Sequence, residues 1–449
     1  MQKSRHPALA IRSLTGLDKS VFDILARAKG QSPTQSEISE KLHGAASQSS
    51  VSRSITRLVA EGLVEKFGTK RFTQFKATPE ALWFSLPFNA RPKVPFDPNR
   101  IGAYFSSQKP WLPAEAAARM KAASPVLAPS IDAATFSREI AERFMIDLAY
   151  ASSALEGNTY SHLETEVLIK YGESAGGRTA EEATMILNHK AAIGWIIEDI
   201  DRVRIEPDTA MRLHALLMRG LVRHDNAGAV RRHAVGISGS AYEPTVDGSA
   251  LSCGLAELCS AVSMREDPFE ASFGLLAGLA YLQTFADGNK RLGRVMASIP
   301  LLKNGLAPLS FVGVDRSAYS AGMLSWYELA DPTPLADAVA EGYETSAPAY
   351  AVAHAVKRVP RGIEIRERQR TNKVLADYFR AYVEGDRTEP FDFAVQQFRD
   401  LALDDRAHMA TYVSEVVEAL NESSAIAYGI DRELYASYAL ARDQSDGPP

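Results

Sequence analysis

Apolar positions spaced three or four residues apart dominate this chain, and this spacing is typical of amphipathic helices. It extends over residues 131–345 and again over residues 350–443. Residues 273–285 (FGLLAGLAYLQTF) are apolar on nearly all sides, as expected of a central buried helix. Residues 229–246 interrupt the pattern with Gly and β-branched residues, which predict a short hairpin or flap. We therefore expect a mainly α fold with one small β-hairpin flap.

The first 85 residues have a different organisation, with three short helical patterns followed by a hairpin pattern. The helices are predicted at residues 16–29, 34–43 and 47–64, and two strand-like runs flank Gly68. This order resembles MarR-like winged helix-turn-helix domains. In that fold the third helix lies in the major groove of DNA and the hairpin contacts the backbone or the minor groove.

The charge of this N-terminal part agrees with a polyanionic partner. Residues 1–85 hold 13 Lys and Arg against 7 Asp and Glu, a balance of +6, whereas the whole chain carries −5. Arg53 and Arg57 are one helical turn apart and can reach the same groove. A solvated basic face, or a winged helix that contacts protein, would have the same charge. The DNA-binding candidates are Ser50, Ser52, Arg53, Arg57, Lys70, Arg71 and Lys76.

The pattern divides the chain into five parts. We expect a winged helix-turn-helix domain, a Pro-rich linker that packs along the surface with one short helix at 113–123, a large helical domain, a C-terminal helical region and a disordered tail. Their bounds are 1–85, 86–130, 131–345, 350–443 and 444–449.

Composition excludes several classes of protein. No apolar run approaches the roughly 18 residues that cross a bilayer, and the N-terminus lacks the apolar segment of a signal peptide. The two cysteines, Cys253 and Cys259, are too few for a disulfide framework or a structural zinc site. We expect a cytoplasmic protein with no membrane partner.

The chemistry is concentrated in one loop, residues 283–294 (QTFADGNKRLGR). Arg291 and Arg294 lie three apart at the start of a predicted helix, and a helix N-terminus already favours anions. Asp287 offers the hard oxygen ligand that phosphate-bound Mg²⁺ prefers. Gly288 permits a tight turn that brings backbone N–H groups near phosphate oxygens. The loop therefore predicts a site for a nucleotide and its metal ion.

This loop resembles the signature of the Fic family, H-x-F-x-D/E-G-N-x-R-x-x-R. The matching residues are Phe285, Asp287, Gly288, Asn289, Arg291 and Arg294. Residues 152–158 (SSALEGN) resemble the family's inhibitory motif through Ser152, Glu156 and Gly157. Residues 228–244 resemble its flap, which aligns target segments by adding a strand; the flap candidates are Ile237, Gly239, Tyr242 and Pro244. The resemblance covers about residues 110–345.

Three positions depart from the family pattern. Gln283 stands where the family has its catalytic histidine, Thr284 where Pro is usual, and Lys290 where Gly is usual. In having Lys at this position the chain resembles the related Doc toxins, which transfer phosphate. A neutral amide has no usable basicity near pH 7. Loss of a general base typically costs 10²–10⁴-fold in rate, or about 3–5 kcal/mol. No residue is therefore a confident catalytic candidate.

The resemblance implies a role for each remaining site residue. Asp287 would bind Mg²⁺, and Asn289 with the loop backbone would hold the α-phosphate of ATP or a related nucleotide. Arg291 and Arg294 would hold the β- and γ-phosphates, and Glu156 would pair with Arg294 and block the γ-phosphate position. The alternative for each arginine is a structural ion pair. Phe285, Gly288 and Lys290 complete the nucleotide-binding set.

Three functions remain open at this point. The first is a DNA-binding transcriptional regulator whose Fic domain binds nucleotide but is impaired in AMP transfer. The second is an active adenylyltransferase or phosphotransferase with an atypical site, autoinhibited by Glu156, that modifies itself or a protein target. The third is a Fic fold that has lost nucleotide binding as well. A winged helix that reads a two-fold operator would favour a homodimer.

Overall fold

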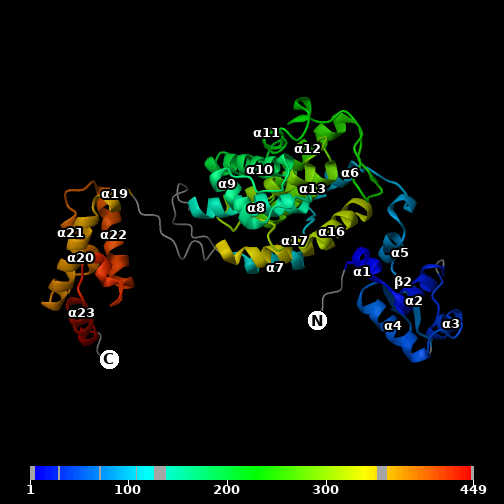
Figure 1. Ribbon diagram of the computed structural model, residues 1–449, viewed down its shortest axis with the longest axis horizontal. Coiled ribbons are helices and arrows are strands. Elements are labelled where there is room, and N and C mark those ends of the chain that lie inside the picture. The colour runs from blue at the N-terminus through cyan, green and yellow to red at the C-terminus, as the bar shows by residue number, and fades with distance from the viewer. Residues whose placement is uncertain are drawn as a thin grey trace. The chain divides into compact units, whose positions relative to one another are not determined.

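The computed structural model describes residues 6–28, 31–69, 72–107, 109–125, 138–350 and 362–445. The chain divides into two compact units, Met1–Val356 and Lys357–Pro449. Both are mainly helical (Figure 1). Among the described residues, no helix combines the length and apolarity that a bilayer crossing requires.

The N-terminal part has three helices and an antiparallel strand pair in the order that the hydrophobic pattern predicts. Val21, Val51, Ile55 and Leu58 are buried in its own core. One further helix precedes these elements and another follows them. In chain order they are α1 (Pro7–Ser13), α2 (Gly16–Ala26), α3 (Gln35–Lys41), α4 (Gln48–Ala60), β1 (Val64–Phe67), β2 (Gln74–Ala77) and α5 (Pro79–Ser85).

The Pro-rich segment is more than a surface linker. After η2 (Phe88–Ala90) and β3 (Val94–Pro95), it forms α6 (Asn99–Ser107) and α7 (Ala114–Ala123). Only α7 was expected. The buried carboxylate of Glu270 accepts hydrogen bonds from Tyr104 Oη at 2.9 Å and from the amides of Trp111 and Leu112 at 2.9 and 2.8 Å. Through these bonds and the burial of Tyr104 and Leu112, the segment packs against the main core. Its proline content does not predict this packing, because the packing depends on tertiary contacts.

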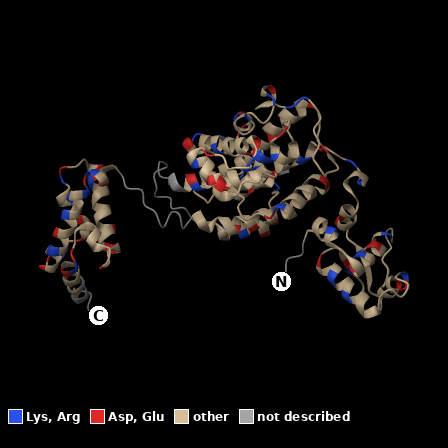
Figure 2. Cartoon of the chain, viewed as in Figure 1, with Lys and Arg blue, Asp and Glu red and all other residues tan. Residues whose placement is uncertain are grey.

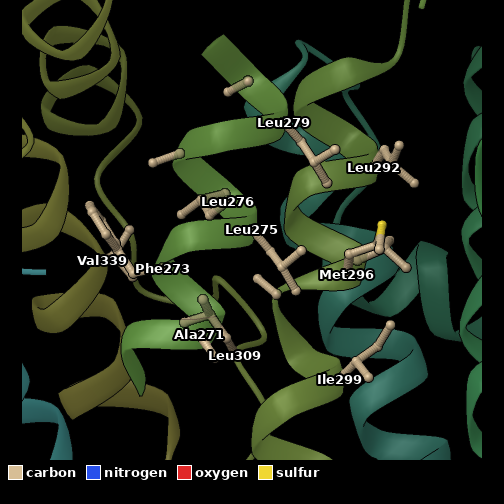
Figure 3. Packing of buried hydrophobic residues seen from close by; sticks show 14 of the residues in the cluster. Ala271, Phe273, Leu275, Leu276, Leu279, Leu292, Met296, Ile299, Leu309 and Val339 are labelled. Carbon is tan, nitrogen blue, oxygen red and sulfur yellow. The ribbon is translucent and has the colours of Figure 1, made fainter. Parts of the chain in front are cut away.

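The large helical domain is built around α13, in which every residue from Phe269 to Leu282 is buried. Figure 3 shows Leu275 and Leu279 of α13 directed toward Met296 and Leu292, while Phe273 lies beside Val339. The helices are α8 (Arg138–Leu155), α9 (His162–Tyr171), α10 (Ala180–Glu198), α11 (Pro207–Leu217), η4 (His224–Asn226), α12 (Gly248–Ser263), α13 (Pro268–Leu282), α14 (Asn289–Met296), α15 (Ser298–Lys303), α16 (Arg316–Leu329) and α17 (Thr333–Ser346).

The expected β-hairpin within residues 229–246 is wrong. The structure describes all of this segment, and its one strand, β4 (Tyr242–Glu243), pairs in parallel with β3. Val94 N donates to Ala241 O and Phe96 N to Glu243 O, both at 3.0 Å. The strand therefore finds its partner in the Pro-rich segment, which lies far away in sequence. We keep the name flap for residues 229–246.

The second unit has a core of its own, rich in tyrosine and phenylalanine. Its last helix extends two residues into the predicted tail, and residues 446–449 lie outside the described part. The elements are α19 (Gly362–Arg366), α20 (Arg368–Val383), α21 (Pro390–Gln397), α22 (Leu403–Ala419), η5 (Ala425–Tyr428) and α23 (Arg432–Ser445).

Candidate functional site

The loop between α13 and α14 owes its shape to two left-handed residues. Gln283 ends α13 with φ 49°, and Gly288 precedes α14 with φ 76°. A Cβ atom at Gly288 would lie 2.4 Å from the sulfur of Met218, far inside van der Waals contact. Gly288 therefore lets the chain turn closely against α11, so that the first turn of α14, with its free N–H groups, opens toward the loop.

Two buried side chains hold the backbone of this loop. Asn289 Oδ1 accepts from Phe285 N at 2.9 Å, and its Nδ2 donates to Phe285 O at 2.9 Å and to Gln283 Oε1 at 3.2 Å. His214 Nε2 bonds Asp287 O at 2.9 Å, its Nδ1 accepts from Gly228 N at 2.9 Å, and its ring stacks on Phe285 at 3.9 Å. Burial lowers the pKa of His214 to about 4, so this ring is neutral.

The flap is fixed to the loop by a buried arginine. Arg231 donates to Gln283 O at 2.6 Å, to His233 O at 2.7 Å and to Thr245 O at 2.5 Å. Arg231 N also donates to Thr284 O at 3.1 Å. One side chain thus joins both ends of the flap to the end of α13.

Arg294 and Glu156 form a buried ion pair, with Nη2 and Oε1 2.6 Å apart and the arginine side chain 0% exposed. Lys290 Nζ lies 3.1 Å from the other oxygen of Glu156. Burial opposes ionisation of this carboxyl, but Arg294 and Lys290 outweigh it and lower the pKa of Glu156 to about 2. Glu156 is therefore an anion held by two cations at physiological pH.

A second layer keeps Arg294 in place. Its Nε donates to Ser152 Oγ at 2.9 Å, its Nη2 to Ser152 O at 3.1 Å, and its Nη1 to Tyr319 Oη at 3.4 Å. Ser152 Oγ also bonds His189 Nε2 at 2.8 Å, while His189 Nδ1 bonds Met185 O. Burial, together with Arg291 and Arg294, lowers the pKa of His189 to about 3. The histidine is therefore neutral and can accept the proton of Ser152.

Arg291 is held less completely. Its Nη2 lies 2.7 Å from Asp287 Oδ2, but its Nε and Nη1 are buried with no hydrogen-bond partner. The residue is only 5% exposed. A buried guanidinium with two unsatisfied nitrogens is costly unless an anion completes it. Asp287 Oδ1 also accepts from Gly288 N at 2.6 Å, but the side chain is 63% exposed, so part of its carboxylate stays accessible at the rim.

These groups surround a cavity of about 200 Å³ between the loop and the flap. Polar and cationic groups line its loop side, whereas Ile237 and Tyr327 line another part of it. The described residues contain no cluster of three or more His, Cys, Asp or Glu side chains that could hold a metal ion alone. Asp287 could therefore hold a cation only together with ligands from a bound molecule, as phosphate-bound Mg²⁺ is often held.

Six of the predicted nucleotide and regulatory residues line this cavity: Glu156, Asp287, Gly288, Asn289, Lys290 and Arg291. Phe285, Arg294 and Ser152 are buried outside its lining, and Gly157 follows Glu156 with φ 101°. Two further differences concern the arginines and Asn289. Both arginines are engaged in ion pairs, as the structural alternative expected. The side-chain amide of Asn289 is hydrogen-bonded to Phe285 and Gln283 within the loop, so only its backbone is available to a ligand.

The predicted flap residues differ in whether they reach the cavity. Ile237 lines the cavity near the turn at Gly239, but Tyr242 and Pro244 are buried. Tyr242 Oη donates to Tyr281 O at 2.9 Å, and its ring stacks on Tyr281. Tyr242 is therefore a packing residue and not the ligand or target contact that the resemblance implied.

The sequence did not reveal four supporting residues, His189, His214, Arg231 and Tyr319. Each acts through a partner far away along the chain, so no local pattern marks it. The only available signal was the unusual Arg231-Arg232-His233 run within the flap.

The DNA-binding candidates of the N-terminal part differ in their exposure and in the contacts they already make. Arg53 of α4 is exposed and makes only 3.4 Å contacts with Ser49 O and Ser50 Oγ. Arg57 is paired with Asp18 of α2 at 2.6 Å. Ser50, Ser52 and Lys76 are partly exposed, whereas Lys70 and Arg71 lie outside the described residues. Lys and Arg are interspersed with Asp and Glu along these elements (Figure 2).

Comparison with known proteins agrees with the motif. Residues 204–301 match the Fic/DOC family. The matched stretch contains the flap and the whole loop, but not Glu156.

Solved structures of similar proteins carry the same family name. A Fic family protein from Desulfovibrio desulfuricans G20 is 18% identical, with a TM-score of 0.45, over 75% of this chain and 92% of that one. Fic-1 (residues 134–508) from C. elegans is 18% identical, with a TM-score of 0.43, over 57% and 73%. A Fic-domain-containing signaling protein from Bacteroides thetaiotaomicron is 16% identical, with a TM-score of 0.40, over 59% and 98%.

Proposed function

We propose that the Fic/DOC family domain at residues 204–301 of this chain binds ATP or a related nucleotide with Mg²⁺ and is impaired in transferring AMP. The observation that carries the proposal is Arg291, whose Nε and Nη1 are buried at the cavity without a partner. Phosphate oxygens satisfy such a guanidinium with charge-assisted, often bidentate hydrogen bonds.

The surrounding groups suit the same ligand. The first turn of α14 directs backbone N–H groups toward the loop, and the helix dipole adds positive potential there. The exposed carboxylate of Asp287 would hold Mg²⁺ jointly with phosphate oxygens. When bound, the ion would neutralise phosphate charge. Asn289 and His214 would hold the loop in its binding shape.

Glu156 would oppose full occupancy. Its ion pair with Arg294 and its contact with Lys290 occupy two cations that a triphosphate would otherwise attract. We therefore propose that Glu156 acts as a brake on the γ-phosphate side, so that ADP binds at least as well as ATP.

Gln283 supports the impaired activity. Its Nε2 donates to Ala280 O at 2.7 Å, and its Oε1 accepts from Asn289. An amide held in this way neither accepts a proton nor turns freely toward a substrate. His189 and His214 do not replace it, because both rings are bonded to protein groups through both nitrogens. An active transferase with an atypical site stays the alternative.

Binding is tested by the ligand-induced stability of the full chain. A nucleotide–Mg²⁺ complex at 100 times its Kd should raise the free energy of unfolding by about 2.7 kcal/mol. Arg291→Met should abolish this gain without lowering the stability of the ligand-free protein, because it removes a poorly satisfied buried cation. Arg212→Met, on the exposed side of α11, is the control and should keep the gain. An undiminished gain in Arg291→Met would contradict the proposed site.

We further propose that the N-terminal part is a winged helix-turn-helix that binds DNA, which would make the chain a transcriptional regulator and favour a homodimer. The supporting observation is the exposed Arg53 on α4, the helix directly before the β1–β2 pair. Its weak intramolecular contacts leave it available to a phosphate or a base edge.

A further inference from the structure

One buried carboxylate joins three separate parts of the first unit. Glu328, near the end of α16, has a side chain that is 0% exposed. Its Oε2 accepts from Trp83 Nε1 at 2.6 Å and from Arg91 Nη1 at 3.2 Å. Its Oε1 accepts from Ser240 Oγ at 2.7 Å and from Ala241 N at 2.9 Å.

The donors come from elements that have different tasks. Trp83 belongs to α5, the last helix of the N-terminal part, and Arg91 to the Pro-rich segment. Ser240 and Ala241 belong to the flap, immediately before β4. Glu328 therefore connects the N-terminal part, the Pro-rich segment and the flap through direct hydrogen bonds.

The connection continues through the backbone on the flap side. Three residues after Arg91, β3 pairs with β4, so Ala241 offers its N–H to Glu328 and its carbonyl to Val94. Earlier in the same flap, Ile237 lines the cavity. A displacement of Arg91 or Glu328 would thus alter the position of the flap against the loop.

Two further residues of α16 lie at or near the cavity. Tyr327 lines it, and Tyr319 Oη contacts the Arg294 that holds Glu156. On the N-terminal side, His6 Nε2 lies 2.8 Å from Ser325 Oγ, and Ala321 packs with Phe84 in a small apolar cluster. One rigid helix thus contacts both the N-terminal part and the groups around the cavity.

We propose that Glu328 is a positioning residue through which the N-terminal part fixes the flap over the cavity. A ligand or partner that displaces α5 would loosen the flap, and a ligand that fixes the flap would in turn steady α5, because such coupling is reciprocal. The consequence for nucleotide affinity rests on the proposed function, but the coupling itself does not.

Hydrogen exchange of the ligand-free full chain tests the coupling. Trp83→Phe removes one N–H donor from the N-terminal side and keeps an aromatic ring. The flap amides at residues 235–246 should then exchange about 2- to 10-fold faster, as expected for loss of one hydrogen bond. Glu328→Gln, which leaves Arg91 buried without its counter-ion, should accelerate the same amides by at least 10-fold. The amides of α13 should be unchanged in both variants.

Two matched variants control for the substitutions themselves. Trp195→Phe on α10 and Glu257→Gln on the exposed face of α12 should leave flap exchange at the wild-type rate. Unchanged flap exchange in both Trp83→Phe and Glu328→Gln would overturn the proposal. So would equal acceleration of the flap and of α13, because that result means global destabilisation. A failure of nucleotide binding alone would leave the coupling intact.

Discussion

Glu156 and Lys290 show how a single position can alter a pocket. The resemblance places a glycine at position 290, and here a lysine contacts the second oxygen of Glu156 at 3.1 Å. Arg294 contacts only Oε1 of that carboxylate, at 2.6 Å. We infer that Lys290 strengthens the hold on Glu156, which is consistent with its strongly lowered pKa.

At the residue scale, His189 makes stability depend on pH. Its pKa is about 3 in the folded protein and about 6.5 when unfolded, so the unfolded chain binds the proton more readily. The stability that the neutral His189 ring contributes is therefore fully present above pH 6.5 and is lost as pH falls toward 3. From pH 7.5 to pH 5, the group should lower the free energy of unfolding by about 2 kcal/mol.

Urea unfolding of wild type and His189→Gln at both pH values measures this contribution. The wild type should lose about 2 kcal/mol more than the variant between pH 7.5 and pH 5. Substitution of the exposed His224 by Gln is the control and should leave the wild-type pH dependence in place. Equal losses in wild type and His189→Gln would show that His189 titrates normally in the fold.

At the element scale, α4 carries the proposed DNA contact. Arg53→Ala should weaken binding to random duplex DNA and lower the slope of log affinity against log salt by about 1, as expected for loss of one phosphate contact. Arg57→Ala should cost less in affinity, because its guanidinium already pairs with Asp18 at 2.6 Å. Fluorescence anisotropy with random duplex at several salt concentrations measures both. Equal, salt-independent affinities in wild type and both variants would contradict DNA binding through α4.

Local patterns predicted some elements well and others poorly. The helices α2, α3 and α4 and the β1–β2 pair carry their own periodicity, and the loop at 283–294 is contiguous in sequence. The β3–β4 pairing joins Val94 to Tyr242, and strands of two residues leave no alternating pattern to read. The burial of Tyr242 is equally invisible in the local pattern, because it depends on Tyr281 and Tyr327 from other helices.

The site was predictable where one segment holds its residues, and less so where distant segments support them. The ion pair of Glu156 with Arg294 followed from the resemblance of two motifs. The engagement of Asn289 within the loop, the Arg231 clamp and the stacking of His214 on Phe285 depend on tertiary contacts. No periodicity reveals such contacts.

At the scale of the whole molecule, the cavity and the coupling through Glu328 lie within the first unit. The second unit has its own aromatic core. Within the first unit, Glu156 lines the cavity, and the N-terminal part reaches the flap through Glu328.

Transfer of labelled AMP from ATP–Mg²⁺ by the full chain tests the central claim, a nucleotide pocket that keeps its brake and lacks its base. Three proteins are compared: wild type, Glu156→Gly, and Glu156→Gly with Gln283→His. Only the double variant should label itself or a protein target, at a rate about 10²- to 10⁴-fold above that of the other two proteins. Adding Arg291→Met to the double variant should abolish this labelling. Labelling by wild type or Glu156→Gly alone, or none by the double variant, would contradict the account.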